Sequence, residues 1–142
     1  MRRASLRPIF LALCLCALRV EAMDRWSALS MLESGNCDGA RGRAGELSRF
    51  QIKPAEWRRY ADRAAPPPTD ARTALTVAQK IMAKRCARFE RAHGRVPTDF
   101  EFYILWNAPA KVDRPPRAVV ARARRFCNLV ARPDGEGSSS GG

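Results

Sequence analysis

The sequence predicts a mainly α-helical protein with a single domain. Apolar residues recur at steps of three and four in the segments 24–33, 71–89 and 119–130, which is the spacing of one helix face. No segment shows the strict alternation of apolar and polar residues that a half-buried strand requires. The 142-residue chain also suits one compact core once its N-terminal segment is set aside.

The first 22 residues have the pattern of a secretory signal peptide. Three arginines within the first seven residues precede an apolar stretch at 9–18 and a small-residue cleavage site at 20–22. The apolar stretch is too short to span a bilayer comfortably, although an uncleaved anchor is the alternative. We therefore expect an exported protein, periplasmic or extracellular, with no stable membrane insertion after cleavage.

The charge balance indicates a polyanionic partner. The chain has 26 Lys and Arg against 14 Asp and Glu, and removing residues 1–22 takes away four arginines and one glutamate, which leaves a net charge of +9. Such a surface attracts polyanions, and outside the cytoplasm these are cell-wall polymers that carry carboxylates and phosphates. Nucleic acid is the competing partner, and the signal sequence argues against it.

The N-terminal half begins with a helix at 24–33, where Trp26, Leu29 and Leu32 share one face. Residues 37–52 are too rich in glycine for a helix and predict an irregular loop or small hairpin. A short helix is expected to begin at Pro54.

The C-terminal half predicts three helices. A long helix capped by Thr69 or Asp70 and ended by Gly94 carries the buried stripe Ala71, Leu75, Ala78, Met82, Cys86 and Phe89, and we expect it to be the central helix. Thr98 and Glu101 have the spacing of a capping box that opens the next helix, which runs to Asn107. The last helix begins at Pro115 and Pro116. Residues 133–142 have no apolar content and are expected to be disordered.

Three cysteines remain after signal cleavage. The apolar stripes place Cys86 and Cys127 on core-facing sides of their helices, so that they form either a disulfide or two buried thiols, with about equal weight. Cys37 is left over. The one histidine, His93, sits at a helix C-terminus, and the chain has too few ligands to predict a metal site or a cofactor.

Glu33 is the candidate catalytic residue. It ends an apolar helix, because the turn formers Ser34-Gly35-Asn36 follow it at once. The negative end of the helix dipole and the apolar neighbours Met31 and Leu32 both disfavour the charged form, so we expect a raised pKa. A carboxylic acid that stays protonated near neutral pH is the general acid that glycosidic bond cleavage requires.

Three short segments carry a family pattern in a fixed order: Glu33-Ser34-Gly35, then Ala-Gly-Glu-Leu-Ser-Arg-Phe-Gln-Ile at 44–52, then Leu-Trp-Asn-Ala-Pro at 105–109. Together they resemble the lysozyme-like lytic transglycosylases and goose-type lysozymes, whose pattern runs Glu-Ser-Gly, Ala-Gly-x-x-Gly-Leu-Met-Gln-Ile and Tyr-Asn-Ala-Gly. The resemblance spans about residues 23–130. Ser48 and Arg49 replace the family's Gly-Leu, Trp106 replaces Tyr, and Pro109 replaces the last Gly.

The resemblance implies a lysozyme-like catalytic domain at 23–132 whose 37–52 loop forms the floor of a cleft. It implies cleavage of peptidoglycan between N-acetylmuramic acid and N-acetylglucosamine by a monomeric lytic transglycosylase without a cofactor, with Glu33 as catalytic acid and base. The substrate-binding residues that follow are Ser34, Gln51, Tyr103, Trp106 and Asn107, and the secondary candidates are Glu46 and Arg49. Either Tyr103, one helical turn before Trp106, supplies the hydroxyl that Trp106 lacks, or that role is lost.

Two alternatives remain open. Glu46 in the loop is a candidate for positioning a water, which would make the protein a hydrolytic lysozyme. The substitutions at Ser48 and Trp106 instead favour a catalytically inactive protein that binds the cell wall on the same fold. Arg41, Arg43 and Arg49 are candidates for contacting lactyl or peptide carboxylates, or else are plain surface charges.

Overall fold

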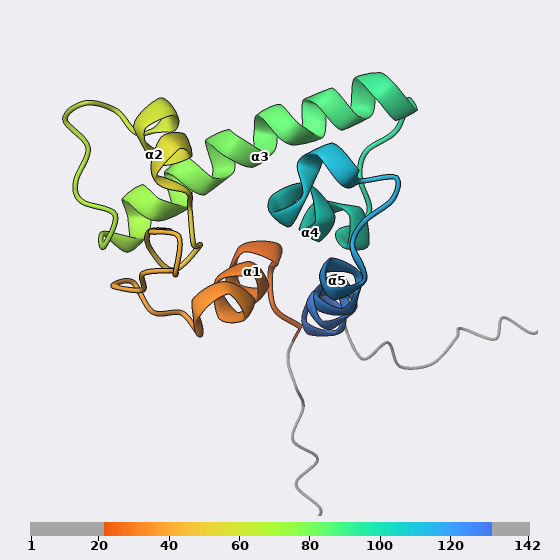
Figure 1. The fold of residues 1–142 in the computed structure, drawn as a ribbon, viewed down its shortest axis with the longest axis horizontal. Coiled ribbons are helices and arrows are strands. Elements are labelled where there is room, and N and C mark those ends of the chain that lie inside the picture. The colour runs from red at the N-terminus through yellow and green to blue at the C-terminus, as the bar shows by residue number, and fades with distance from the viewer. Residues whose placement is uncertain (1–21, 132–142) are drawn as a thin grey trace, which may run out of the picture.

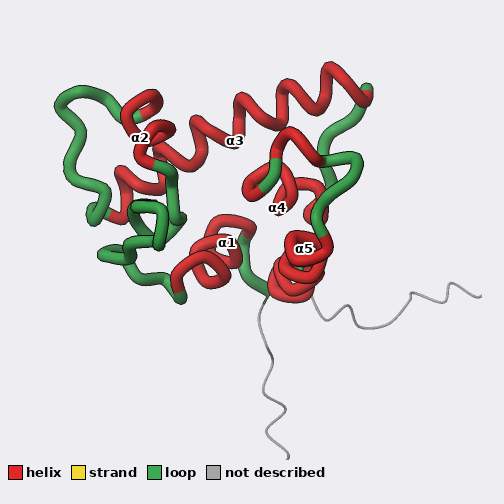
Figure 2. The backbone as a smooth tube through the Cα atoms, in the orientation of Figure 1, coloured by secondary structure: helices red, strands yellow, loops and turns green. Residues whose placement is uncertain are grey.

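The computed structural model describes residues 22–131, and this part of the chain is mainly helical and contains no strand (Figures 1 and 2). The helices are α1 (Arg25–Ser34), α2 (Pro54–Tyr60), α3 (Ala71–His93), α4 (Asp99–Asn107) and α5 (Arg117–Val130), with a 3₁₀ turn, η1, at Pro109–Lys111. The predicted mainly α-helical class is confirmed. The predicted disordered tail, and all of the predicted signal peptide except Ala22, lie outside the described residues.

Local sequence signals set the helix ends. Asp24 caps α1 by accepting from the N–H groups of Trp26 and Ser27, and Asp70 caps α3 through the N–H of Thr73. The capping box of α4 is confirmed, with Thr98 and Glu101 bonded reciprocally. The turn η1 was not predicted, and it arises where Pro109 follows the end of α4.

The central helix is α4 rather than α3. Five consecutive residues of α4, Phe102–Trp106, are buried, as expected for a helix that is apolar all round. α4 packs against both α5 and α3, and Figure 1 shows α3 along one side of the molecule with α4 between it and α5. The prediction of α3 as the central helix is wrong because one face of α3 carries exposed charges such as Lys84 and Arg88.

The buried face of α3 lies partly off the predicted stripe. Ala78, Met82 and Phe89 are buried as predicted, whereas Leu75 and Cys86 are only partly buried. The buried positions that the stripe missed are Ala74, Val77 and Ile81. The face is therefore wider than the predicted row and is shifted around the helix toward these three residues.

The described cysteines are free thiols, so of the two alternatives predicted for Cys86 and Cys127 the disulfide is wrong. α4 lies between α3 and α5, the helices that carry these two residues (Figure 1). Cys37 is exposed, and both Cys86 and Cys127 are partly buried. Burial raises the pKa of each of the two helical thiols, which keeps them protonated.

The segment between α1 and α2 forms the irregular loop that the glycine content predicted. Leu47 makes isolated antiparallel bridges with Arg41 and with Ile52. The Leu47 and Ile52 backbones exchange two hydrogen bonds of 2.8 Å, which closes a tight turn over residues 48–51. Phe50 and Ile52 are buried in the common core, so this loop is fixed to the helices rather than free.

No helix within residues 22–131 has the length and apolar content needed to cross a membrane.

Candidate functional site

Glu33 lies at the last turn of α1 and lines an open cleft. Gly35 ends the helix in the left-handed conformation, with φ 65°, and its N–H donates to Met31 O at 2.9 Å. The Glu33 side chain is only 7% exposed. A carboxyl group this deep needs hydrogen-bond partners, and three residues from α4 and α5 supply them.

One oxygen of Glu33 receives all of its hydrogen bonds. The Tyr103 hydroxyl donates to Oε1 at 2.9 Å, Asn107 Nδ2 at 3.3 Å and the Arg122 guanidinium at 3.2 Å. Within the described residues no fully buried side-chain nitrogen or oxygen lacks a partner, so Oε2, which has no hydrogen-bond partner, is not completely buried. The contacts to Oε1 therefore hold the carboxyl group in place.

Tyr103 is fully buried behind Glu33 and is not among the residues that line the cleft. Burial, together with the charge of Glu33, raises the pKa of the Tyr103 hydroxyl well above its usual value. The hydroxyl stays protonated and continues to donate to Oε1. Tyr103 therefore positions Glu33 from behind and is too deep to meet a ligand in the cleft.

Arg122 is a functional residue that the sequence analysis missed. Besides its ion pair with Glu33, it donates to Leu32 O at 3.2 Å and lies over the ring of Tyr103 at 5.9 Å. Its guanidinium thus links the end of α1 to α5 through both the side chain of Glu33 and the backbone of Leu32. A sequence signal did exist, since Arg122 stands four residues before buried Phe126 and so on the core side of α5.

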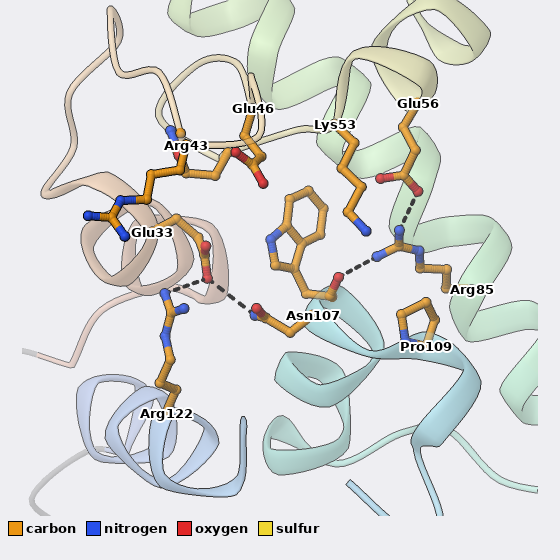
Figure 3. A pocket seen from close by; sticks show the side chains of 12 residues that line it. Glu33, Arg43, Glu46, Lys53, Glu56, Arg85, Asn107, Pro109 and Arg122 are labelled. Atoms are coloured by element: carbon orange, nitrogen blue, oxygen red, sulfur yellow. Dashed lines mark hydrogen bonds and ion pairs between the residues drawn. The ribbon is translucent and has the colours of Figure 1, made fainter. Parts of the chain in front are cut away.

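The cleft has a volume of about 620 Å³ and is open to solvent (Figure 3). Its walls contain residues from each of the five described helices, from η1 and from the loop between α1 and α2. The lining residues are Glu33, Gly42, Arg43, Glu46, Gln51, Lys53, Glu56, Arg85, Trp106, Asn107, Pro109 and Arg122. Of the sequence-predicted site residues, this brings together Glu33, Glu46, Gln51, Trp106 and Asn107.

Ser34 and Arg49 do not line the cleft, and their hydrogen bonds stabilise the loop between α1 and α2. The Ser34 hydroxyl donates to Arg49 O at 2.8 Å and accepts from Cys37 N at 3.1 Å. The Arg49 side chain makes two hydrogen bonds to Asp38, at 2.5 and 2.9 Å. This fork lowers the pKa of Asp38 and raises that of Arg49. Both residues thus stabilise the turn after Glu33 instead of facing a ligand.

Glu46 and Gln51 lie close together over Gly42. A side chain at position 42 would bring its Cβ to 2.0 Å from Glu46 Oε2 and 2.7 Å from Gln51 Oε1, so only glycine leaves both groups where they are. Gln51 has φ 53° and donates from Nε2 to Ser48 O at 3.1 Å, while Glu46 Oε2 accepts from Ala44 N at 3.0 Å. The two side chains present an amide and a carboxylate to the cleft.

The opposite wall is held by Arg85, another residue that the sequence analysis missed. Arg85 donates to Leu105 O at 2.9 Å and Trp106 O at 2.6 Å, which satisfies carbonyl groups in the last turn of α4. It also pairs with Glu56 and lies over the Trp106 ring at 5.6 Å. Arg85 therefore fixes the end of α4 that carries Trp106 and Asn107.

Within residues 22–131, no group of three or more His, Cys, Asp or Glu side chains could hold a metal ion. His93 ends α3, where its ring stacks on Phe89 at 4.0 Å and its Nε2 lies 3.0 Å from Asp113 Oδ1. Comparison of the chain with protein-family models, with curated proteins and with solved structures gave no match.

Proposed function

We propose that this protein is a peptidoglycan-cleaving enzyme of lysozyme-like fold, acting as a lytic transglycosylase between N-acetylmuramic acid and N-acetylglucosamine. The observation that carries the proposal is the difference between the two oxygens of the Glu33 carboxyl group. Three donors bind Oε1, whereas Oε2 has no partner among the described residues, and Glu33 lines the open cleft. Further support comes from the family-like segments that carry Glu33, Gln51 and Asn107, because all three residues line that cleft.

The proposal places the transferable proton of Glu33 on Oε2. Support comes from Oε1, which accepts from Tyr103, Asn107 and Arg122 and so suits the role of the carbonyl oxygen of the acid. A general acid needs such a proton within reach of the glycosidic oxygen.

The proposed reaction uses one carboxyl group twice. Glu33 Oε2 donates its proton to the glycosidic oxygen as the bond from that oxygen to the muramoyl C1 breaks, which releases the N-acetylglucosamine hydroxyl. The resulting carboxylate then takes the proton of the muramoyl C6 hydroxyl while the C6 oxygen attacks C1. A 1,6-anhydro ring forms, no water is consumed, and Glu33 is protonated again.

The other lining residues have roles that follow from their chemistry. The Asn107 and Gln51 amides can hydrogen-bond the acetamido groups of the sugars, and the flat face of Trp106 suits packing against a sugar ring. Trp106 is largely buried, with 8% exposed, so only part of its ring reaches the cleft.

Hydrolysis is the second candidate, and the position of Glu46 favours it. Glu46 lines the cleft and has no cationic partner among the described residues. A free carboxylate there can accept a proton from an attacking water, as in glycosidases that use two carboxyl groups. The released sugars would then carry reducing ends in place of anhydro ends.

The deciding experiment is turnover of purified peptidoglycan by the parent chain and by Glu33→Gln. The substitution keeps size and hydrogen bonding but removes the transferable proton, so activity should fall about a hundredfold or more. Glu46→Gln is the matched control in the same cleft and should retain activity if the enzyme is a transglycosylase. Mass spectrometry of the products separates the two chemistries, because anhydro products are lighter by one water.

Three outcomes would change this assignment. Full turnover in Glu33→Gln would remove Glu33 from catalysis. Reducing-end products together with an inactive Glu46→Gln would make the protein a hydrolase. Binding of glycan strands without turnover by the parent chain would make it an inactive cell-wall-binding protein.

A further inference from the structure

The cleft contains more charge than the proposed reaction uses. Its charged lining residues are three glutamates and four cations, namely Glu33, Glu46, Glu56, Arg43, Lys53, Arg85 and Arg122. Two ion pairs, Arg122–Glu33 and Arg85–Glu56, neutralise four of these groups (Figure 3). Two cations and one carboxylate are left unpaired.

Arg43 and Lys53 are the unpaired cations. Both side chains are exposed, and neither has a hydrogen bond or an ion pair with any described residue. In Figure 3 Arg43 lies on the same side of the cleft as Glu33, and Lys53 lies toward Glu56. Glu46 carries the remaining charge and has no cation within ion-pair distance, so the cleft keeps a net positive charge.

The loop sequence alone did not show which of its arginines faces the cleft. Arg49 is held in its fork with Asp38, and Arg41 is exposed but does not line the cleft. Arg43 is the one of the three that does, and Lys53 joins it from the residue before α2. Two unpaired cations in one open cleft are a site for an anionic group of the ligand.

We propose that Arg43 and Lys53 each contact a ligand carboxylate from its own side of the cleft and so make it a carboxylate-binding subsite, which selects glycan strands that carry carboxylates over neutral strands of N-acetylglucosamine alone. This inference rests on the proposed function, since it names the strand that the same cleft binds. Two sources supply the carboxylate. In peptide-free strands it is the free lactyl group of the muramoyl residue, and in peptide-bearing strands it belongs to the stem peptide.

Binding is best measured in the Glu33→Gln chain, which cannot consume its ligand. The probes are chitooligosaccharides, peptide-free glycan strands and peptide-bearing glycan strands of matched length. We expect carboxylate-bearing strands to bind about tenfold tighter than chitooligosaccharides at low salt, and the difference to shrink as salt screens the charges. The stronger of the two carboxylate-bearing probes identifies the source.

Single substitutions then locate the effect. Arg43→Gln and Lys53→Gln should each weaken binding of the carboxylate-bearing strands by about threefold to fivefold and leave chitooligosaccharide binding unchanged. Arg41→Gln is the matched control, because it removes the same charge from the same loop outside the cleft. Arg41→Gln should leave the affinities for carboxylate-bearing strands and for chitooligosaccharides unchanged.

The outcomes separate this inference from the proposed function. Equal affinity for neutral and carboxylate-bearing strands would overturn the subsite, even if the parent chain cleaves peptidoglycan. Equal losses in Arg41→Gln and Arg43→Gln would assign the preference to the overall positive charge and would also overturn it. A preference that depends on Arg43 and Lys53, in a chain that cleaves no strand, would support the subsite and remove the catalytic proposal.

Discussion

The two walls of the cleft are built in different ways. The wall that holds Glu33 is made of α1, α4 and α5. In its key contact, the hydroxyl of the fully buried Tyr103 donates to Glu33. The other wall is the loop between α1 and α2, which turns through positive φ at Asn36, Ser48 and Gln51. Its polar contacts are mostly local, such as the fork between Arg49 and Asp38.

The difference shows how one small domain combines an acid held by a buried core with a binding surface held by local turns. Buried aromatic packing leaves the Glu33 wall few alternative arrangements. In the loop wall, non-glycine residues at positive φ, such as Ser48 and Gln51, cost about 1–3 kcal/mol each and persist only where the surroundings determine them. This cost offsets part of the packing energy of the loop, so a truncated side chain should destabilise the loop wall less than the helical wall, and matched substitutions in the two walls test this.

The largest effect is expected from removing an aromatic ring from the helical wall. Phe126 is fully buried and contacts Phe102 and Tyr103, with ring centroids 5.8 and 5.4 Å away. Phe126→Ala should lower the free energy of unfolding by about 3–5 kcal/mol. The matched variant is Phe50→Ala in the loop wall, which should cost less because a loop can close over the space. Chemical denaturation measures both, and equal losses would contradict the contrast between the walls.

A smaller effect is expected at Tyr103, on activity. Tyr103→Phe keeps the buried ring but removes one of the three donors to Glu33 Oε1. We expect kcat to fall about tenfold, equivalent to about 1.4 kcal/mol, with KM nearly unchanged because Tyr103 does not reach the cleft. Steady-state kinetics on soluble glycan strands test this. A raised KM with normal kcat would instead place Tyr103 against the substrate.

The smallest effects, on the free energy of unfolding, are expected at two arginine–carboxylate ion pairs. One is Arg95–Glu101 at the start of α4, and the other is Arg49–Asp38 in the loop. In the helical wall, Arg95 and the Thr98 backbone lower the pKa of Glu101 to about 2, against an ordinary value of 4.5. In the loop wall, Arg49 lowers the pKa of Asp38. Glu101 has a side chain 19% exposed and Asp38 one 39% exposed, so Glu101 is the better shielded of the two.

Folding lowers the pKa of both carboxyl groups, so each ionised carboxylate stabilises the folded state. This contribution is complete above the unfolded-state pKa and is lost as pH falls through the folded-state pKa. For Glu101 this window runs from about pH 4.5 down to about pH 2. Glu101→Gln should cost about 1–2 kcal/mol at pH 7 and almost nothing near pH 2, while Asp38→Asn should cost below about 1 kcal/mol. Denaturation at several pH values checks both, and a loss in Glu101→Gln that is independent of pH would contradict this origin.

Local features of this protein were readable from its sequence because they depend on residues close together along the chain. The capping box of Thr98 and Glu101, the helix start at Pro54 and the helix end at Glu33 are examples. The spacing of Tyr103 and Asn107 also placed both on one face of α4, from which both now donate to Glu33.

Tertiary structure decided what lies around these features. The partners of Glu33 are 70 to 89 positions away, so only the folded chain shows that Arg122, on the core side of α5, meets Glu33. Packing also placed α4 between α3 and α5, left Cys86 and Cys127 unpaired, and directed Arg43 to the cleft but Arg49 to Asp38. Hydrophobic periodicity specifies which face of a helix is buried, but only the assembled core specifies which element covers it.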